Sequence, residues 1–429
     1  MNPQASLIIV SQGRPDHLAT CLESLRNQTH PNFEVIVVGD HLPAGFGEIV
    51  KYIPFRDANI AAARNLGLGV AAADVLAFCD DDAVPDPQWL ENLLASFVDP
   101  KIASSGGFTR GRNGISRQWG AMRFDLAGCD IAIEIDESAP FQTFGPDTET
   151  PVKLIGTNMA FRTSALRDIG GFDEAFHFFL EDADAKLRLD QKGWKSALVP
   201  RAQVHHRFAA STRRTSARIP TDLYEIGASK AHFCAKHMPD AQVALQEFAR
   251  QQRERLKKLQ SEKRLTSQQS SDLLQGLQKG LNSRPRRVKY AAKSTPAPFL
   301  HFPIKSGPHV LLCARLRDKI WLADTAVKLH NAGVRVTALQ FLPSIRYFQV
   351  RFSDGYWHHQ GGVWGKSTRT EPLVAIRSYA QKFRREQTRI MQHADIGFVV
   401  YNAPGQFQPN TAELTALAGY KVETLLNNA

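Results

Sequence analysis

Short apolar runs alternate with helical patterns over the first quarter of this chain. The run Ser6 to Val10 predicts a buried strand, and further strands are expected at Glu34 to Val38 and Val75 to Cys79. Between and after them, apolar residues recur at helical spacing, as in Leu18, Cys21, Leu22 and Leu25. Because short turns join these elements, the order predicts an α/β domain with a mainly parallel sheet.

Three consecutive carboxylates, Asp80, Asp81 and Asp82, directly follow the strand Val75 to Cys79. Open α/β sheets bind ligands at the carboxyl edge, which is where these side chains are expected. A cluster of carboxylates repels itself, so it is commonly neutralised by a cation. Alternate residues of an extended segment point the same way, so Asp80 and Asp82 could share one Mg²⁺ or Mn²⁺ ion. The alternative interpretation is a solvated acidic turn before the next helix.

Length and cysteine usage limit the class of protein. A chain of 429 residues with 43% hydrophobic content exceeds the ~250–300 residues at which one core stops growing, so at least two domains are expected. No apolar run reaches the ~18 residues that cross a bilayer, and the first residues show no signal-peptide pattern. The five cysteines are scattered without a Cys-x-x-Cys pair, which argues against a disulfide framework or a zinc site and favours a cytoplasmic location.

The net charge of +11 is concentrated in one segment. Residues 251–293 contain 12 Lys and Arg against three acidic residues, a balance of +9, and the rest of the chain is nearly neutral. This segment could contact an anionic membrane peripherally, at about 1 kcal/mol for each basic residue near the surface. Nucleic-acid binding is disfavoured because Tyr290 is the only aromatic residue of the segment, so bases would find no stacking platform.

A second acidic pair, Glu181 and Asp182, is expected at the N-terminus of the helix Glu181 to Gln191. Acidic residues are favoured in a first helical turn on dipole grounds alone. The preceding apolar segment Phe176 to Leu180 supports a catalytic role, because desolvation makes a carboxylate more basic, as a general base requires.

Two neighbouring histidines, His205 and His206, follow on an extended segment. Neighbours on a strand face opposite ways, so only one of them could be a metal ligand. Three arginines beyond them could clamp a diphosphate, and a basic surface loop is the alternative interpretation: Arg207, Arg213 and Arg214.

An ordered series of motifs covers the first half of the chain. It contains Ser6-Leu7-Ile8-Ile9-Val10-Ser11, Glu34-Val35-Ile36-Val37-Val38-Gly39-Asp40, Ala62-Ala63-Arg64-Asn65-Leu66-Gly67, Phe78-Cys79-Asp80-Asp81-Asp82 with Pro85, Gly156-Thr157-Asn158-Met159-Ala160-Phe161-Arg162, Gly170-Gly171-Phe172-Asp173, Glu181-Asp182-Ala183-Asp184 with Arg188, and Pro200 to His206. In this order the motifs resemble a family 2 glycosyltransferase with the GT-A fold, a Rossmann-like domain.

The resemblance implies a nucleotide site and a metal site. It places Asp40 on the nucleoside and Asp80 on the ribose–diphosphate side. Asp82 would hold the metal, with His206 favoured over His205 as its further contact. The nucleotide-sugar set it implies is Asp40, Arg64, Asp80, Asp81, Gly156 and Asn158, of which Gly156 and Asn158 would lie near the junction of sugar and acceptor.

The resemblance also implies the reaction. Asp182 would be the catalytic base, with Glu181 as the fallback, in a metal-dependent, inverting transfer from a nucleotide-diphosphate sugar to a hydroxyl of a glycan or glycolipid. The second strand ends in Gly39-Asp40-His41-Leu42 rather than the family's usual Asp-Asn/Gly-Ser, which leaves the preferred nucleotide base open. A non-catalytic sugar-nucleotide-binding or scaffold protein and a nucleotidyltransferase are the alternatives.

The domain organisation expected from these patterns has three parts. Residues 1–220 form the GT-A domain, residues 221–298 a helical segment with a basic linker, and residues 299–429 a smaller C-terminal α/β domain. The last domain repeats the strand–helix–strand order but lies outside the resemblance and has neither an acidic cluster nor a glycine-rich phosphate loop.

Overall fold

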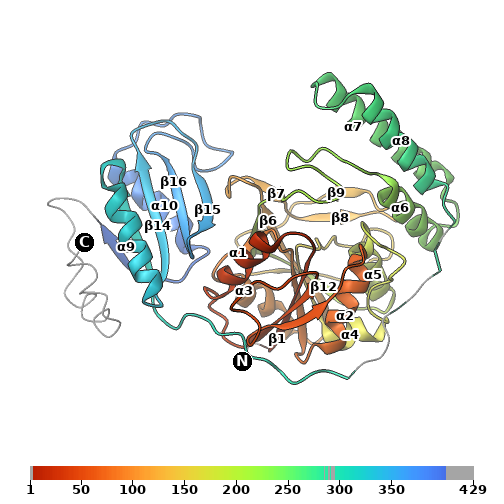
Figure 1. Ribbon diagram of the computed structural model, residues 1–429, viewed down its shortest axis with the longest axis horizontal. Helices are drawn as coiled ribbons and strands as arrows, with labels where there is room; N and C mark the ends of the chain where they lie inside the picture. The colour runs from red at the N-terminus through yellow and green to blue at the C-terminus, as the bar shows by residue number, and fades with distance from the viewer. Residues whose placement is uncertain (1–2, 285, 288–289, 291–294, 402–429) are drawn as a thin grey trace.

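The computed structural model describes residues 3–401, apart from residues 285, 288–289 and 291–294. It contains two α/β units and a long helical hairpin (Figure 1). The first unit is built on a ten-stranded sheet with the order β10-β12-β6-β11-β4-β1-β2-β3, to which β5 and β7 add at the side. Its strands are β1 (Ala5–Ser11), β2 (Phe33–Gly39), β3 (Lys51–Pro54), β4 (Val75–Cys79), β5 (Ala83–Pro85), β6 (Ile102–Arg110), β7 (Arg117–Trp119), β10 (Gln142–Phe144), β11 (Asn158–Arg162) and β12 (Lys195–His206). A separate pair is formed by β8 (Met122–Phe124) and β9 (Asp130–Ala132).

Helices cover both faces of this sheet because its strands are apolar on both sides. Leu7 and Ile9 of β1 belong to one core, and Ile8 between them belongs to the other. The first core is closed by α1 (Pro15–Leu25) and α3 (Trp89–Ala95), which the short 3₁₀ helix Ser96–Val98 follows. The second core is closed by α2 (Ile60–Val70), α4 (Thr163–Asp168) and α5 (Glu181–Gln191).

Strand direction decides which side chains meet. β1 pairs in parallel with both β2 and β4, so the ends of these three strands lie at one edge. β11 pairs antiparallel with β4 and with β6, which makes β6 parallel to β4 again. β12 then pairs in parallel with β6, so its end comes to the same edge. The longest ladders are therefore parallel, and the expected α/β class is confirmed.

Two strands were not foreseen from the sequence. β3 lies partly exposed at the edge of the sheet, and β6 lies buried near its centre. The run Ser104-Ser105-Gly106-Gly107 conceals β6, because it lacks the β-branched and aromatic residues that are typical of a strand. In the structure these small residues are buried, and Ser104 and Ser196 join β6 to β12 by a hydroxyl hydrogen bond of 2.8 Å.

The second unit is a five-stranded sheet with the order β15-β16-β14-β13-β17, in which only β15 is antiparallel to its neighbour. Its elements are β13 (His309–Arg315), the 3₁₀ helix Leu316–Asp318, α9 (Lys319–Asn331), β14 (Arg335–Leu342), β15 (Gln349–Ser353), β16 (Tyr356–Gly362), α10 (Tyr379–Met391) and β17 (Ile396–Tyr401). This confirms the smaller α/β unit. Phe302 packs in the first unit's core against Phe33, so the segment that starts at Phe299 still belongs to that packing.

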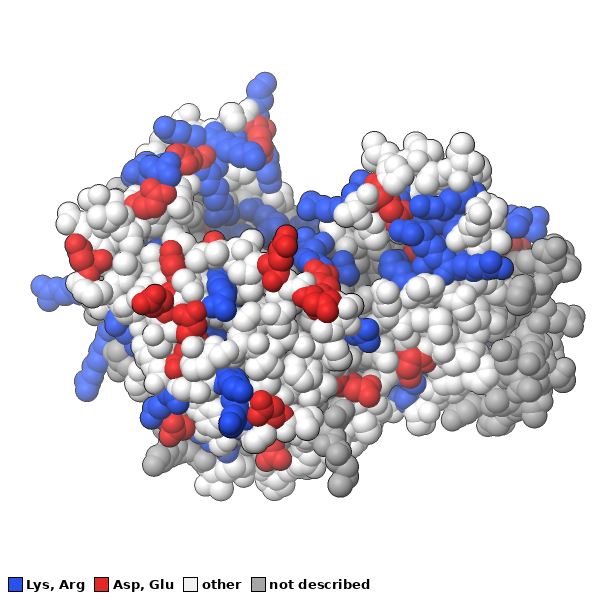
Figure 2. All heavy atoms as spheres, turned by 180° about the vertical axis from the view of Figure 1, so that it is seen from behind, with Lys and Arg blue, Asp and Glu red and all other residues white. Residues whose placement is uncertain are grey.

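The helical segment is formed by α6 (Tyr224–His237), α7 (Gln242–Ser261) and α8 (Ser267–Leu281). The pair α7 and α8 projects from the first unit, and Figure 2 shows Lys and Arg gathered in the hollow between this pair and the second unit. The basic segment 251–293 lies partly outside the described residues, and its contact with a membrane stays a prediction. Among the helices of the described ranges, none combines the length and apolarity that a bilayer crossing requires.

Glycines allow α6 and α8 to touch backbone to backbone. A Cβ on Gly280 would lie 2.2 Å from the Tyr224 carbonyl oxygen and 2.8 Å from the Ala228 nitrogen. A Cβ on Gly276, one turn earlier in α8, would meet nothing nearer than the Asp222 carboxylate at 3.3 Å. The two glycines of one helix therefore have opposite packing constraints.

We expect Gly280→Ala to destabilise the packing of α8 on α6 by about 1–3 kcal/mol, because these two helices must separate to admit the methyl group. Gly276→Ala is the matched control and should be neutral or stabilising, since alanine is the better helix former by about 1 kcal/mol. Urea unfolding followed by circular dichroism measures both. Equal effects of the two substitutions would contradict the close packing.

Candidate metal and nucleotide site

A cleft of about 550 Å³ opens at the carboxyl edge of the first sheet. Four strands bring side chains to it: Ser11 ends β1, Asp40 follows β2, Asp80 follows β4, and His206 ends β12. These residues are far apart in the sequence and meet because the strands end at the same edge. The cleft is thus the place where an open α/β sheet binds its ligand.

Asp80, Asp82 and His206 form a group that could hold a metal ion. One ligand atom from each residue lies within 4.8 Å of the others. Carboxylate oxygens and an imidazole nitrogen are ligands that Mn²⁺ accepts, and the set leaves room for substrate oxygens. The donor set therefore fits the divalent ion that the sequence predicts.

Asp82 is the most strongly held carboxylate of the group. Its Oδ1 lies 3.1 Å from His206 Nε2, and its Oδ2 accepts a hydrogen bond of 2.7 Å from the Ala209 backbone N–H. Arg14 and Arg214 approach the same Oδ2 at 3.2 and 3.7 Å. Burial raises the pKa of Asp82, but His206 and the nearby cations outweigh it and hold the pKa below its usual value. The carboxylate is therefore anionic at neutral pH.

Asp81 has a different environment from its neighbours. Its side chain is fully buried, accepts a hydrogen bond of 2.7 Å from the Ser11 hydroxyl and lies 2.6 Å from Arg14. Burial raises its pKa to about 7. Asp81 therefore ties β4 to β1 and to Arg14 beneath the cleft, and in this structure it does not line the cleft.

The two neighbouring histidines point to opposite sides of β12. His206 faces the cleft, where Trp119 stacks on its ring at 5.8 Å between centroids. His205 instead contacts Asp86 at 2.8 Å and packs against Trp357 of the second unit. His205 is thus turned away from the metal group, and the alternation of side chains along a strand is the physical reason.

Asp40 and two arginines line the rest of the cleft. Both carboxylate oxygens of Asp40 accept from the Gly13 backbone N–H, at 3.1 and 3.0 Å. Arg213 lies over the Phe178 ring and donates to the Ala58 carbonyl at 3.0 Å, and Arg214 approaches Asp82. Arg207 lines a different surface hollow. Two of the three arginines expected to meet a diphosphate are therefore at the cleft.

The acidic pair at the start of α5 is divided between two environments. Glu181 is buried and pairs with Arg64 at 2.7 Å, while burial and the neighbouring Asp182 raise the pKa of Glu181. Asp182 is half-buried and accepts hydrogen bonds from the Gly156 N–H at 3.1 Å and the Ala183 N–H at 2.8 Å. Of the pair, only Glu181 is buried away from solvent as expected, and Asp182 remains partly accessible.

Arg64 and Asn158 make hydrogen bonds and ring contacts inside the first unit. Arg64 lies over the rings of Phe78 and Phe172 and donates to the Gly156 carbonyl at 3.3 Å. Asn158 is fully buried, accepts from Trp89 at 2.8 Å, and donates to the Phe108 and Ala202 carbonyls. Neither side chain lines the cleft, and the ligand contacts expected of Arg64 and Asn158 stay predictions. Their amide and guanidinium groups are engaged in internal contacts instead.

The segment that leads into α5 is backbone-strained. Phe179 and Leu180 both adopt positive φ, at 79° and 70°, a conformation that is rare for bulky residues. Leu180 packs against Phe124 and Phe233, and these contacts compensate for the unfavourable backbone. Strain of this kind persists where the surrounding structure fixes it, and here it sets the direction of Glu181 and Asp182.

Arg14 and Trp119 are cleft residues that sequence reasoning missed. The signal for Arg14 was present, because it follows β1 directly at the turn after Gly13. Trp119 carries no such signal. It lies on the short strand β7, in a region without periodicity, and only pairing with β6 brings it beside His206.

Comparison with known proteins agrees with this geometry. Residues 6–170 match the family model described as Glycosyl transferase family 2. A pre-mycofactocin glycosyltransferase of Mycobacterium tuberculosis is 34% identical over 189 residues, covering 43% of this chain and 37% of that protein. An N-acetylglucosaminyl-diphospho-decaprenol L-rhamnosyltransferase of the same species is 44% identical over 215 residues, covering 44% of this chain and 64% of that protein.

The chain spans less than two thirds of the length of either relative. A solved structure of GalNAc-T7 with UDP, GalNAc and Mn²⁺ matches 48% of this chain and 44% of that chain, at 18% identity and a TM-score of 0.38, a likeness too low to carry an argument. The family match covers all of the cleft's first three strands and the aspartate triplet. Residues 6–170 therefore match a glycosyl transferase family 2 domain, as the motifs from Ser6 onward indicated.

Proposed function

We propose that this chain transfers a sugar, with inversion, from a nucleotide-diphosphate sugar to a hydroxyl of a glycan or glycolipid. The observation that carries the proposal is the convergence of Asp80, Asp82 and His206 at the carboxyl edge, within a cleft that arginines also line. A glycolipid acceptor is supported by the name of one relative, the N-acetylglucosaminyl-diphospho-decaprenol L-rhamnosyltransferase.

The donor would bind along the strand ends. Asp40 lies at the end of β2, where a carboxylate can accept hydrogen bonds from the nucleoside. Arg213 and Arg214 lie across the cleft and would neutralise the diphosphate with charge-assisted hydrogen bonds. Asp80, Asp82 and His206 would hold a divalent ion, which when bound supplies further positive charge for the leaving diphosphate.

Asp182 would take the proton from the acceptor hydroxyl. Its half-buried carboxylate is oriented by two backbone N–H groups. Asp182 itself does not line the cleft, and Phe178, four residues earlier, is the lining residue nearest to it in the sequence. Glu181 is less available to an acceptor in this geometry, because its side chain is buried and one of its oxygens pairs with Arg64. A single base that activates the attacking hydroxyl gives direct displacement, and direct displacement inverts the anomeric carbon.

The first prediction concerns Asp82. Asp82→Asn keeps the shape of the side chain but removes the negative charge, so transfer should fall about 100-fold or more and Mn²⁺ should no longer raise the melting temperature. Asp74→Asn, an exposed position outside the cleft, is the matched control. Normal Mn²⁺ stabilisation of the Asp82 variant would contradict the proposed metal site.

The second prediction separates the two candidate bases. Asp182→Asn should reduce transfer about 10²–10⁴-fold while donor binding, measured by calorimetry, stays unchanged. Glu181→Gln should mainly lower stability, because it leaves Arg64 buried without its anionic partner. Loss of transfer in the folded Glu181 variant together with an active Asp182 variant would reverse the assignment.

The released product distinguishes the proposal from its alternatives. A glycosyltransferase releases a nucleoside diphosphate, and a nucleotidyltransferase releases pyrophosphate. A non-catalytic sugar-nucleotide-binding protein would bind the donor and release neither.

A further inference from the structure

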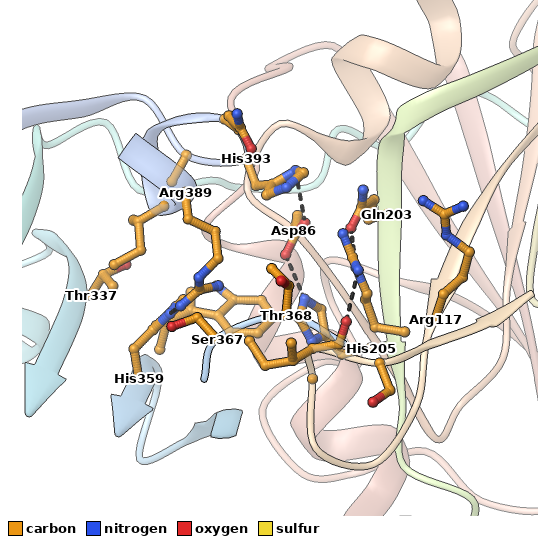
Figure 3. A pocket seen from close by; sticks show the side chains of 18 of the residues that line it. Asp86, Arg117, Gln203, His205, Thr337, His359, Ser367, Thr368, Arg389 and His393 are labelled. Carbon is orange, nitrogen blue, oxygen red and sulfur yellow. Dashed lines mark hydrogen bonds and ion pairs between the residues drawn. The ribbon is translucent and has the colours of Figure 1, made fainter. Parts of the chain in front are cut away.

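A second cavity, of about 490 Å³, lies between the two α/β units (Figure 3). The first unit contributes residues of β6, β7 and β12, and the second contributes β16, the segment 367–370 and the end of α10. None of its lining residues lines the cleft described above. The cavity and the cleft lie on opposite sides of β12, because His205 points into the cavity and its neighbour His206 points into the cleft.

Direct packing fixes the walls of this cavity. The Val350 N–H of β15 donates to the Asn113 carbonyl at 2.8 Å, and Gly114 lies so close that a Cβ there would be 2.4 Å from the Val350 carbonyl oxygen. Val84 and Ile115 of the first unit belong to the same core as residues of the second sheet. The cavity is therefore enclosed by a packed interface between the two units of the chain.

Positive charge predominates in the lining. Four arginines face two carboxylates, Asp86 and Glu137. Both carboxylates already have partners, as Asp86 contacts His205 at 2.8 Å and His393 at 3.5 Å, and Glu137 pairs with Arg117. Figure 3 shows Asp86 between the two histidines. Asp86 and Glu137 therefore do not form ion pairs with the other three arginines of the lining.

Arg110 and Arg369 form no ion pair with a carboxylate among the described residues, although Asp86 lies near enough to Arg110 to raise its pKa. Arg110 donates to the neutral oxygens of Gln203 and Ile115, at 2.5 and 2.8 Å. Burial lowers the pKa of Arg110 to about 10, which leaves it charged at neutral pH. Arg369 is exposed at the rim, and Arg389 approaches from α10, where it also contacts Glu386 and His359.

Two histidines of the lining, His359 and His393, add no charge of their own. Burial lowers the pKa of His393 to about 4 and the pKa of His359 well below its usual value, so both are neutral at pH 7. Neutral imidazoles and the hydroxyls of Ser116, Thr368 and Thr370 supply hydrogen-bonding groups without charge. The lining therefore combines unpaired guanidinium groups with neutral polar groups.

We infer that this interdomain cavity is a second ligand site that binds a small phosphate-bearing molecule. Guanidinium groups recognise phosphate oxygens by paired, charge-assisted hydrogen bonds, and the hydroxyls complete the set. The site takes the phosphate of a soluble molecule or the phosphate of a lipid whose tail extends outside. Because both units supply ligands, the bound anion would hold the second unit against the first.

Calorimetry on the full chain tests the site, with inorganic phosphate and glucose 1-phosphate as soluble probes and dihexanoyl phosphatidic acid as the lipid probe. The wild type should bind one class of probe or both. Arg369→Gln, at an exposed position, and Arg110→Gln should each weaken binding about tenfold or more. Arg384→Gln, at an exposed position of α10 that lines neither the cavity nor the cleft, is the matched control and should leave this affinity unchanged.

Location is tested by crystals soaked in tungstate, a heavy analogue of phosphate, whose anomalous signal should lie beside Arg110. Absence of binding to every probe would overturn the inference. So would equal affinity of the wild type and the folded Arg369→Gln chain, or loss of phosphate binding in Arg213→Gln alone, which would assign the anion to the other cleft.

Discussion

Parallel strand pairing is the constraint from which the rest of this structure follows. β1, β2 and β4 run side by side in one direction, and two antiparallel steps through β11 return β6 and β12 to that direction. Each of these strands therefore ends at the same edge. Residues separated by more than a hundred positions, such as Asp82 and His206, come within hydrogen-bonding distance as a result.

The carboxylates gathered at this edge need compensation, and each receives it differently. Asp82 is held anionic by His206, Arg14 and the Ala209 N–H. Asp81 is buried, and its pKa rises to about 7 even with Arg14 beside it. Asp80 stays half-buried at the cleft. The triplet thus places Asp80 and Asp82 in the cleft and buries Asp81 beneath it, because successive residues point in different directions.

Most of the fold of the first unit could be predicted, and particular residues explain where prediction failed. Apolar periodicity located β1, β2, β4 and α5 within one or two residues, since their sequences pack directly against a core. β6 was missed because its serines and glycines are buried by close backbone packing, which periodicity does not register. Trp119 was missed for a related reason, as it reaches His206 only through the pairing of β7 with β6.

The sequence by itself located the carboxylates and the histidine pair of the cleft region, because strand-end carboxylates and neighbouring histidines on a strand are local patterns. It also predicted that only one of those histidines could be a metal ligand, since neighbouring side chains on a strand point to opposite faces. Tertiary structure decided where each of them points, turning His206 to Asp82 and His205 to Asp86. It alone decided that Arg64 would pair with Glu181 and that a cationic cavity would lie between the two units, because both depend on contacts between distant segments.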